Sequence, residues 1–424
     1  MKEISVQIEL PDSIRPEILW AWDLFASHIG LSYRIVDDAP ALRVAMEPEG
    51  DIPISHAFEG SMRKGMTGQR TVLPEEPLIR CADGRSDPLG TAFYMVNSVQ
   101  EWNAEGTDLD RYGRFSSTAT YQYRFGVFEK DLVSELFEAL YQRLAQKLPL
   151  PSWPDGPSRV FLTHDIDRIV NGDIREAVWS ARKGKILRAG SCLLKRLSGP
   201  HEWDNIREIL ALHEESGFKS CFFWLPEKGK DEKGVLNADH DVKAPHFQEL
   251  MREIEQRGFW NGLHKSSFEG TFATEFDKLT HALPIDRNHY LMIRLPDHYE
   301  RLEREGFRAD SSLGFSDSIG FRNSYGLPFH PFDTLERKKM NLLEIPLHIM
   351  DSALHHLEGD PMKRMEEFIE THQRNRIITV LWHNNLFSKG KFERWRRYYL
   401  QLLDRLQEGQ LQSFDPKAAL EERA

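Results

Sequence analysis

Short apolar segments and amphipathic segments alternate along the first 150 residues. Apolar residues at every second position predict strands, and apolar residues at helical spacing predict helices. The predicted strands are 4–10, 31–36 and 42–46, and the predicted helices are 15–29, 87–102 and 130–148. The polar stretch that contains Gly60, Gly65 and Gly68 is predicted as a loop. The pattern therefore predicts a mixed α/β domain over residues 1–150, whose role the sequence does not indicate.

A proline-rich segment separates this domain from the rest of the chain. Four prolines among the nine residues 149–157 can neither continue a helix nor lie in a central strand. Beyond it, short apolar runs alternate with helix-like segments closed by glycine, which is typical of a parallel sheet or barrel. The predicted strands are 160–164, 219–225, 259–264, 290–293, 307–310, 342–350 and 377–383. Residues 151–424 are therefore predicted to form a second α/β domain.

Two acids close the first of these strands, in Thr163-His164-Asp165-Ile166-Asp167. Because side chains alternate across a strand, Asp165 and Asp167 point the same way. Catalytic groups of α/β proteins gather at such strand ends, and two nearby carboxylates disfavour each other's ionisation unless a cation neutralises them. The pair predicts a metal site, in which one acid binds the metal and the other moves protons. The alternative is a strand that leads into a polar turn.

Later strand ends also carry ionisable or ligand-type side chains. They are His264, His289 (at the start of the predicted strand 290–293), Asp310, Asp351 and His383. A lone histidine is more often structural than functional. Parallel strands, however, bring their carboxyl ends to one edge of a sheet, so we expect several of these residues to converge there.

Composition narrows the classes of function. The chain of 424 residues has a net charge of −11, which argues against a general nucleic-acid binder. No run approaches the roughly 18 apolar residues of a membrane span, and the N-terminus lacks an apolar core of signal-peptide length. Three widely spaced cysteines indicate neither a disulfide framework nor a cysteine zinc site. We expect a cytoplasmic protein with reduced thiols, and the oligomeric state is not predicted.

Residues 177–197 form a basic segment that also carries several leucines. The leucines make the segment amphipathic as a helix, and the basic residues are Arg182, Lys183, Lys185, Arg188, Lys195 and Arg196. A solvated basic helix explains this composition. The alternative is peripheral contact with anionic lipid.

Six short motifs carry a resemblance to a known family. They are Thr163 to Asp167 (T-H-D-I-D), Gly262 to His264 (G-L-H), Arg287 to Tyr290 (R-N-H-Y), Asp310 to Phe315 (D-S-S-L-G-F), Pro328 to Asp333 (P-F-H-P-F-D) and Trp382 to Asn384 (W-H-N). Together they resemble a divergent bacterial branch of the polysaccharide deacetylase family, which implies a distorted (β/α) barrel of about seven strands. Residues 1–150 resemble the uncharacterised domain that precedes this barrel in many bacterial relatives, through Asp87-Pro88-Leu89 and Gly113-Arg114-Phe115.

The resemblance implies the metal-dependent removal of an acetyl group from an amino sugar. It makes Asp165 the general base that takes a proton from a metal-bound water, and His383 the general acid that protonates the leaving amine. Asp167 and His264 would bind one divalent metal ion, most readily zinc, with cobalt, nickel or manganese as alternatives. Arg287 would pair with Asp165 and keep its carboxylate ionised.

The chain departs from the family pattern at one of the expected metal ligands. Typical members have a second histidine four residues after the first, where this sequence has Phe268. We assign the third ligand to His289, with a water or His164 as alternatives. An incomplete site would make the protein a degenerate, non-catalytic relative.

Other residues are expected to shape the substrate cleft or to support the catalytic residues. Asp310, Arg322, Asp333 and Trp382 are predicted to contact the substrate. A bidentate contact of Arg322 with a sugar carboxylate or phosphate is expected, with a surface arginine as the alternative. Asp351 would orient His383 from behind, or else cap a buried strand.

Three classes of function follow from these residues. The first is a metal-dependent hydrolase that removes an N-acetyl or other acyl group from an amino-sugar or polysaccharide precursor in bacterial surface-polysaccharide biosynthesis. The second is a catalytically weak sugar-binding or scaffold relative in such a pathway. The third is a metal phosphoesterase, which the sequence supports less well, because one D-x-D and a few histidines are few ligands for a two-metal site.

Overall fold

The computed structural model describes residues 3–73, 75–198 and 201–421. The chain divides into two compact units. Unit 1 comprises residues 1–156, 293–303 and 320–346, and unit 2 comprises residues 157–292, 304–319 and 347–424. The first division lies in the proline-rich segment, but two later segments return to unit 1, so the predicted domain 151–424 is interrupted twice. Residues 1–2, 74, 199–200 and 422–424 of the predicted domains lie outside the described residues.

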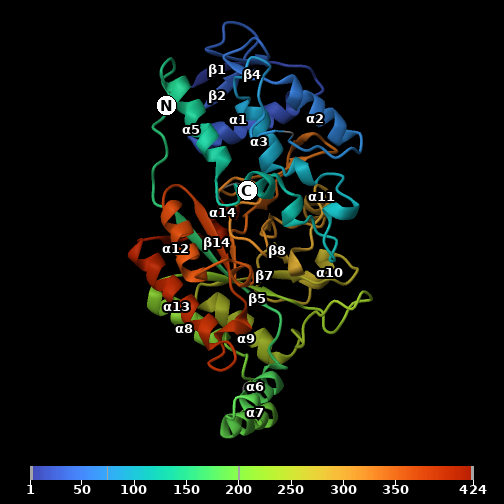
Figure 1. The fold of residues 1–424 in the computed structure, drawn as a ribbon, viewed down its shortest axis with the longest axis vertical. Coiled ribbons are helices and arrows are strands. Elements are labelled where there is room, and N and C mark those ends of the chain that lie inside the picture. The colour runs from blue at the N-terminus through green and yellow to red at the C-terminus, as the bar shows by residue number, and fades with distance from the viewer. Residues whose placement is uncertain (1–2, 74, 199–200, 422–424) are drawn as a thin grey trace. The chain divides into compact units, whose positions relative to one another are not determined.

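Unit 1 is built on a parallel sheet with strand order β2-β1-β3-β4 (Figure 1). Its strands are β1 (Ile4–Glu9), β2 (Tyr33–Ile35), β3 (Leu42–Met46) and β4 (Ile52–Ile54). Its larger helices are α1 (Arg15–His28), α2 (His56–Met66), α3 (Pro88–Val96) and α5 (Leu132–Ala145), with a single-turn α4 (Tyr121–Phe125). The predicted mixed α/β character of this part of the chain is confirmed.

One prediction for unit 1 is wrong, because the glycine-containing stretch is the helix α2. Ser55 caps this helix by accepting a hydrogen bond from the Ala57 amide. Phe58 and Met62, four residues apart, are buried and anchor one face of the helix. This apolar contact outweighs the low helix propensity of glycine, which costs about 1 kcal/mol per residue relative to alanine.

The returning segment 320–346 supplies aromatic side chains to the core of unit 1. The ring of Phe332 lies edge-on to Phe93 of α3 with ring centroids 5.0 Å apart, and the Tyr325 hydroxyl lies 3.0 Å from His28 Nδ1. The two returning segments contain most of α11 (Asp297–Arg304) and the short strands β10 (Phe332–Asp333), β11 (Lys338–Lys339) and β12 (Leu343–Glu344). Unit 1 therefore needs residues from the second half of the chain to complete its core.

Unit 2 is built on a parallel sheet in the order β9-β8-β7-β6-β5-β14-β13, with β15 paired to β5 (Figure 1). The strands are β5 (Arg159–Ile166), β6 (Ser220–Trp224), β7 (Trp260–Lys265), β8 (Ile285–Asn288), β9 (Ala309–Asp310), β13 (Ile349–Met350), β14 (Ile377–Leu381) and β15 (Gln412–Ser413). The helices are α6 (Gly172–Arg182), α7 (Ile186–Ser198), α8 (Ile206–Ser216), α9 (Pro245–Gln256), α10 (Phe272–Phe276), α12 (Pro361–Thr371), α13 (Glu393–Glu408) and α14 (Pro416–Glu421).

Alternating strands and helices confirm the predicted (β/α) arrangement of unit 2. Residues of β5, β6 and β14 are buried on both faces, as expected for strands covered by helices. A backbone hydrogen bond from the Leu347 amide to the Leu313 carbonyl joins the segment before β13 to the segment after β9. The two ends of the strand order thus approach each other, which gives the sheet its barrel-like closure.

Three predicted elements need correction. The predicted strand 342–350 is two short strands, β12 (Leu343–Glu344) in unit 1 and β13 (Ile349–Met350) in unit 2. Residues 290–293 do not form the predicted strand: the strand β8 ends at Asn288 and a 3₁₀ turn, η4 (His289–Leu291), follows it. Tyr290 and Leu291 take left-handed backbone angles there, with φ of 56° and 53°. The basic segment 177–197 is two helices rather than one. It breaks at Gly184, whose φ of 73° suits glycine and ends α6.

None of the helices in the described part of the chain is both long enough and apolar enough to cross a membrane.

Candidate active site

Alternation along β5 sends Asp165 and His164 to opposite faces of the sheet. His164 is buried between the sheet and α13, where its Nδ1 donates to the Trp382 carbonyl oxygen (2.8 Å) and its ring packs on Tyr399. Burial lowers the pKa of His164 to about 4. The alternative in which His164 serves as a metal ligand is therefore wrong, because its ring faces away from Asp165 and is held there.

His264, at the end of β7, points its Nε2 at Asp165 of β5 and at Asp167 directly after that strand. Its Nδ1 lies 2.6 Å from the Arg287 carbonyl oxygen, which can only accept, so Nδ1 carries the hydrogen. Its Nε2 then faces Asp167 Oδ1 at 3.3 Å and Asp165 Oδ2 at 3.4 Å. A backbone hydrogen bond of this kind fixes the tautomer and orientation of a metal-binding imidazole.

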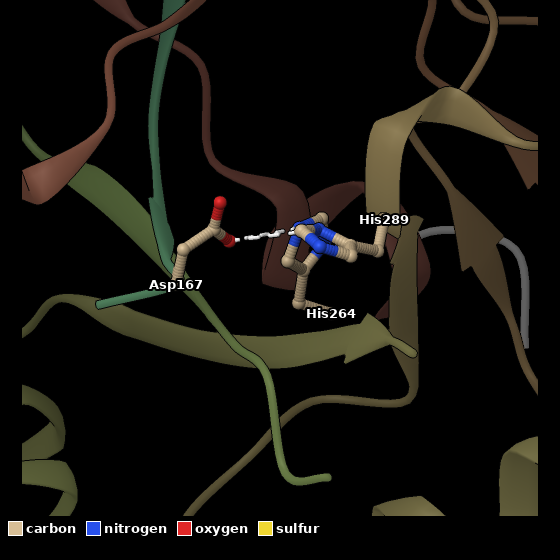
Figure 2. A group of neighbouring side chains, drawn as sticks. All are labelled: Asp167, His264 and His289. Atoms are coloured by element: carbon tan, nitrogen blue, oxygen red, sulfur yellow. Dashed lines mark hydrogen bonds and ion pairs between the residues drawn. The ribbon is translucent and has the colours of Figure 1, made fainter. Parts of the chain in front are cut away.

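A backbone carbonyl also fixes the tautomer of His289, but with the hydrogen on Nε2 instead of Nδ1. Its Nε2 lies 2.9 Å from the Leu236 carbonyl oxygen and therefore carries the hydrogen. Its Nδ1 lies 3.0 Å from His264 Nε2 and 3.7 Å from Asp167 Oδ1. Figure 2 shows the side chains of Asp167, His264 and His289 converging. The carbonyl of Leu236 was not predicted, because a backbone acceptor on a loop leaves no signal in the sequence.

The geometry of these three side chains fits a divalent metal ion. Asp167, His264 and His289 each offer one ligand atom, and these atoms all lie within 4.8 Å of one another. Atoms about 2.0–2.2 Å from a zinc ion are about 3–3.6 Å apart, close to the separations seen here. Two imidazole lone pairs at 3.0 Å would repel each other, so the distance between His264 Nε2 and His289 Nδ1 requires either a shared proton or a metal ion between them. The residues present are therefore able to hold a metal.

The ionisation of Asp167 and His289 also suits this use. Burial alone would raise the pKa of Asp167, but His289, His264 and His383 together lower it, so the carboxylate stays charged. Burial lowers the pKa of His289 to about 4 against the opposing charge of Asp167, so this imidazole is neutral near pH 7. The pKa of His264 is instead raised, because the negative charges of Asp165 and Asp167 outweigh the effect of burial. A metal ligand must be a carboxylate or a neutral imidazole.

Asp165 and Arg287 lie next to each other but do not form a close pair. Arg287 Nη1 is 3.9 Å from Asp165 Oδ1, and Arg287 Nη2 donates instead to Ser311 Oγ at 2.8 Å. Both side chains are buried, and within the described residues Asp165 Oδ1 and Arg287 Nη1 have no hydrogen-bond partner. Arg287 therefore supplies positive charge to the Asp165 side of the site, while that carboxylate oxygen is left to interact with another group.

His383 reaches the same cluster from the end of β14. Asp351 Oδ2 accepts hydrogen bonds from His383 Nδ1 (2.8 Å) and from the His383 amide (2.6 Å). His383 Nε2 lies 3.6 Å from Asp167 Oδ2. Burial opposes the charged imidazolium, but Asp351, Asp167 and Asp165 outweigh it and raise the pKa of His383 to about 10. His383 is thus a protonated donor, oriented by Asp351, whose Nε2 faces the metal ligands.

The four residues predicted to contact substrate are all buried. Arg322 lies in unit 1, where its Nε and Nη2 donate to both carboxylate oxygens of Glu101 at 2.8 and 2.6 Å. The bidentate contact of Arg322 is thus with Glu101 and not with a sugar carboxylate or phosphate, and the buried side chain is not the surface arginine of the alternative either. Asp333 Oδ1 accepts from the amides of residues 335 and 336, Asp310 accepts from Ser312 Oγ, and Trp382 packs on Tyr399 in the core. These contacts all lie within the protein, and the substrate contacts predicted for Asp310, Asp333 and Trp382 stay predictions.

An ion pair supports the loop that carries Phe268. Lys265 Nζ donates to Glu275 Oε1 at 2.6 Å and to the Phe268 carbonyl at 3.0 Å. Glu275 also accepts from the Ser266 amide and hydroxyl at 2.9 and 2.7 Å. The loop after His264 is thus fixed by buried polar contacts, and the second histidine of the cluster comes from the neighbouring strand.

Comparisons with known proteins give a partial match. A family model described as a family of unknown function (DUF7033) matches residues 44–149, and no curated protein matches the chain. Similar solved structures include a protein described as a polysaccharide deacetylase from Mycobacterium smegmatis (13% identity, TM-score 0.38, covering 64% of this chain and 92% of that chain). A polysaccharide deacetylase from Bacillus cereus (12%, 0.31, 62% and 94%) and a mutant peptidoglycan deacetylase from Bacillus subtilis (11%, 0.27, 63% and 91%) also match. TM-scores this low do not establish a shared activity, so the chemistry of the site has to be derived from the residues of this chain.

Proposed function

We propose that unit 2 is a metal-dependent hydrolase that removes an acyl group, most simply N-acetyl, from an amino sugar in bacterial surface-polysaccharide biosynthesis. The observation that carries the proposal is the convergence of Asp167, His264 and His289. Backbone carbonyls orient both imidazoles so that His264 Nε2 and His289 Nδ1 face each other. The six sequence motifs that resemble the polysaccharide deacetylase family direct the choice of substrate.

Asp167, His264 and His289 would hold the metal. A carboxylate with two imidazoles suits zinc and the neighbouring first-row metals cobalt, nickel and manganese, and the same ligand set also serves iron(II). A bound divalent cation would polarise the acyl carbonyl oxygen and lower the pKa of water at the site.

Asp165 and His383 would perform the proton transfers. The Asp165 carboxylate takes a proton from the water that attacks the acyl carbon, with Arg287 Nη1 3.9 Å from Asp165 Oδ1. His383, held protonated by Asp351, donates its Nε2 proton to the sugar nitrogen as the bond from carbon to nitrogen breaks. The carboxylic acid and the free amine are the products.

Metal content with activity tests this proposal. Purified wild-type protein should hold about one metal ion per chain and release acetate from N-acetylated amino-sugar oligomers. His264→Ala and His289→Ala should each lose the metal and the activity. His281→Ala is the matched control, because His281 is a histidine paired with Glu255 on the surface of unit 2. A wild-type protein that neither contains nor binds zinc, cobalt, nickel, manganese or iron would refute the hydrolase.

A catalytically weak sugar-binding relative was the alternative suggested by the missing histidine at Phe268. The position of His289 beside His264 supports the enzyme over this alternative, since it supplies the absent ligand from β8. A protein that binds metal and sugar but hydrolyses no acylated amino sugar would favour the binding role.

A further inference from the structure

The helices α6 and α7 form a hairpin that extends away from the sheet of unit 2 (Figure 1). Ala177 of α6 packs on Ala189 and Cys192 of α7 in a small apolar contact. On the same side, Arg188 and Lys195 both pair with Glu202, at 2.9 and 2.5 Å. One side of α7 is therefore held in place.

The other side of α7 is an exposed apolar face. Five large apolar side chains gather there, and Ile186, Leu187, Leu193, Leu194 and Leu197 are 66, 93, 50, 66 and 83% exposed. At about 100° per residue they lie on one stripe of the helix, away from the side that contacts α6. Exposure of this many large apolar residues on a single 13-residue helix marks an interaction surface.

The charge of the hairpin indicates what binds there. Residues 177–197 contain six basic residues and no acidic residue, in a chain whose net charge is −11. Arg182, Lys183 and Lys185 are exposed at the connection between the two helices, and Arg196 is exposed near the end of α7. An apolar stripe with basic residues beside it matches the acyl chains and headgroups of an anionic bilayer.

The same charges argue against a second copy of the chain as the occupant. Two hairpins that joined their leucine faces would bring together the exposed basic side chains of both copies, and like charges repel; these include Arg182, Lys183, Lys185 and Arg196 of each copy. The 13 residues of α7 make a helix about 20 Å long, which is too short to span a bilayer but suits a helix that lies in the interface.

We infer that the α6–α7 hairpin docks unit 2 on an anionic membrane surface, with the leucines of α7 inserted among the lipids and the basic residues at the headgroups. The inference does not depend on the proposed hydrolase. Within that proposal, docking would bring the site to a lipid-linked or membrane-proximal amino sugar.

Vesicle co-sedimentation of the full chain tests the inference. Wild-type protein should bind vesicles of phosphatidylcholine with about one-third phosphatidylglycerol, bind pure phosphatidylcholine much more weakly, and lose affinity as salt is raised. The triple variant Leu187→Ser/Leu193→Ser/Leu197→Ser should bind at least about tenfold more weakly. Lys183→Ser/Lys185→Ser should lose about fivefold per charge.

Matched controls stand elsewhere on the surface. Leu335→Ser removes a leucine that is 76% exposed in unit 1, and Lys338→Ser/Lys363→Ser removes two exposed lysines; both should bind within about twofold of wild type. The exposed positions of all the variants let them fold, which thermal melts check. His264→Ala should bind vesicles like wild type, so failure of the hydrolase and failure of docking give different results.

Three results would overturn the inference. One is absence of wild-type binding to anionic vesicles at low salt. Another is equal binding by the wild type and the leucine variant, which would leave only a non-specific charge effect. The third is a wild-type dimer that becomes monomeric in the leucine variant, which would assign the apolar face of α7 to a second copy of the chain.

Discussion

Replacement of His289 by alanine tests the most specific feature of the site. His289 Nδ1 is 3.0 Å from His264 Nε2 and 3.7 Å from Asp167 Oδ1, so the ring lies where a third ligand would stand. Structural zinc sites with four protein ligands bind with roughly 10–16 kcal/mol, or roughly 3–4 kcal/mol for each ligand. At about 1.4 kcal/mol per tenfold, His289→Ala should weaken metal binding about 10²–10³-fold.

Competition with a chromophoric chelator measures this loss. Metal-free wild type, His289→Ala and the surface control His281→Ala would each compete for zinc at fixed pH. We expect the control to match the wild type within about twofold. Circular dichroism at the assay temperature separates weak binding from unfolding, since His289→Ala also leaves the Leu236 carbonyl without its donor. A dissociation constant for His289→Ala within about tenfold of wild type would refute His289 as a ligand and return that place to a water.

Three further predictions concern side chains around and beyond the site. Asp351→Asn should lower kcat at least about tenfold with little change in KM, because His383 loses the carboxylate that keeps it protonated and aimed; steady-state kinetics should show partial rescue in Asp351→Glu. Arg322→Met should destabilise the protein by about 3–5 kcal/mol in urea unfolding, because it leaves buried Glu101 unpaired, while KM stays unchanged. Burial raises the pKa of Asp87 to about 7, so the protonated carboxyl that stabilises the fold is lost as pH rises through 7. Between about pH 4 and pH 8, the free energy of unfolding of the wild type should therefore fall by up to about 4 kcal/mol more than that of Asp87→Asn.

The residues of the candidate metal site and of the proposed proton transfers could be grouped from the sequence because they lie at or just after strand ends. Apolar runs located β5, β7 and β14, and parallel pairing brings the ends of such strands to one edge of the sheet. Asp167, His264 and His383 could thus be grouped before any coordinates. The strand β8 was displaced in the prediction, because its buried sequence Ile285–Asn288 is mostly polar and gives no apolar run.

The internal pairing of Arg322 could not be predicted from the sequence, because residue type does not reveal burial. An arginine that binds a sugar carboxylate and one that pairs with an internal glutamate look alike in sequence. Only the fold shows that Arg322 and Glu101, 221 positions apart, form a buried pair. Likewise, nothing local indicates that the Leu236 carbonyl selects the tautomer of His289.

The register of the sheet explains how the third ligand can come from β8. His264 of β7 is paired with Arg287 of β8, so residue 289 lies just beyond the next pair on the neighbouring strand. Left-handed angles at Tyr290 and Leu291, which cost about 1–3 kcal/mol each, turn the chain there, and Asn288 Nδ2 supports the turn by donating to the Met292 carbonyl. A strained turn directly after a ligand is expected where the turn positions that ligand. If His289, directly after β8, is the third ligand, the loop after His264 does not need to supply one; that loop is fixed instead by the pair of Lys265 with Glu275.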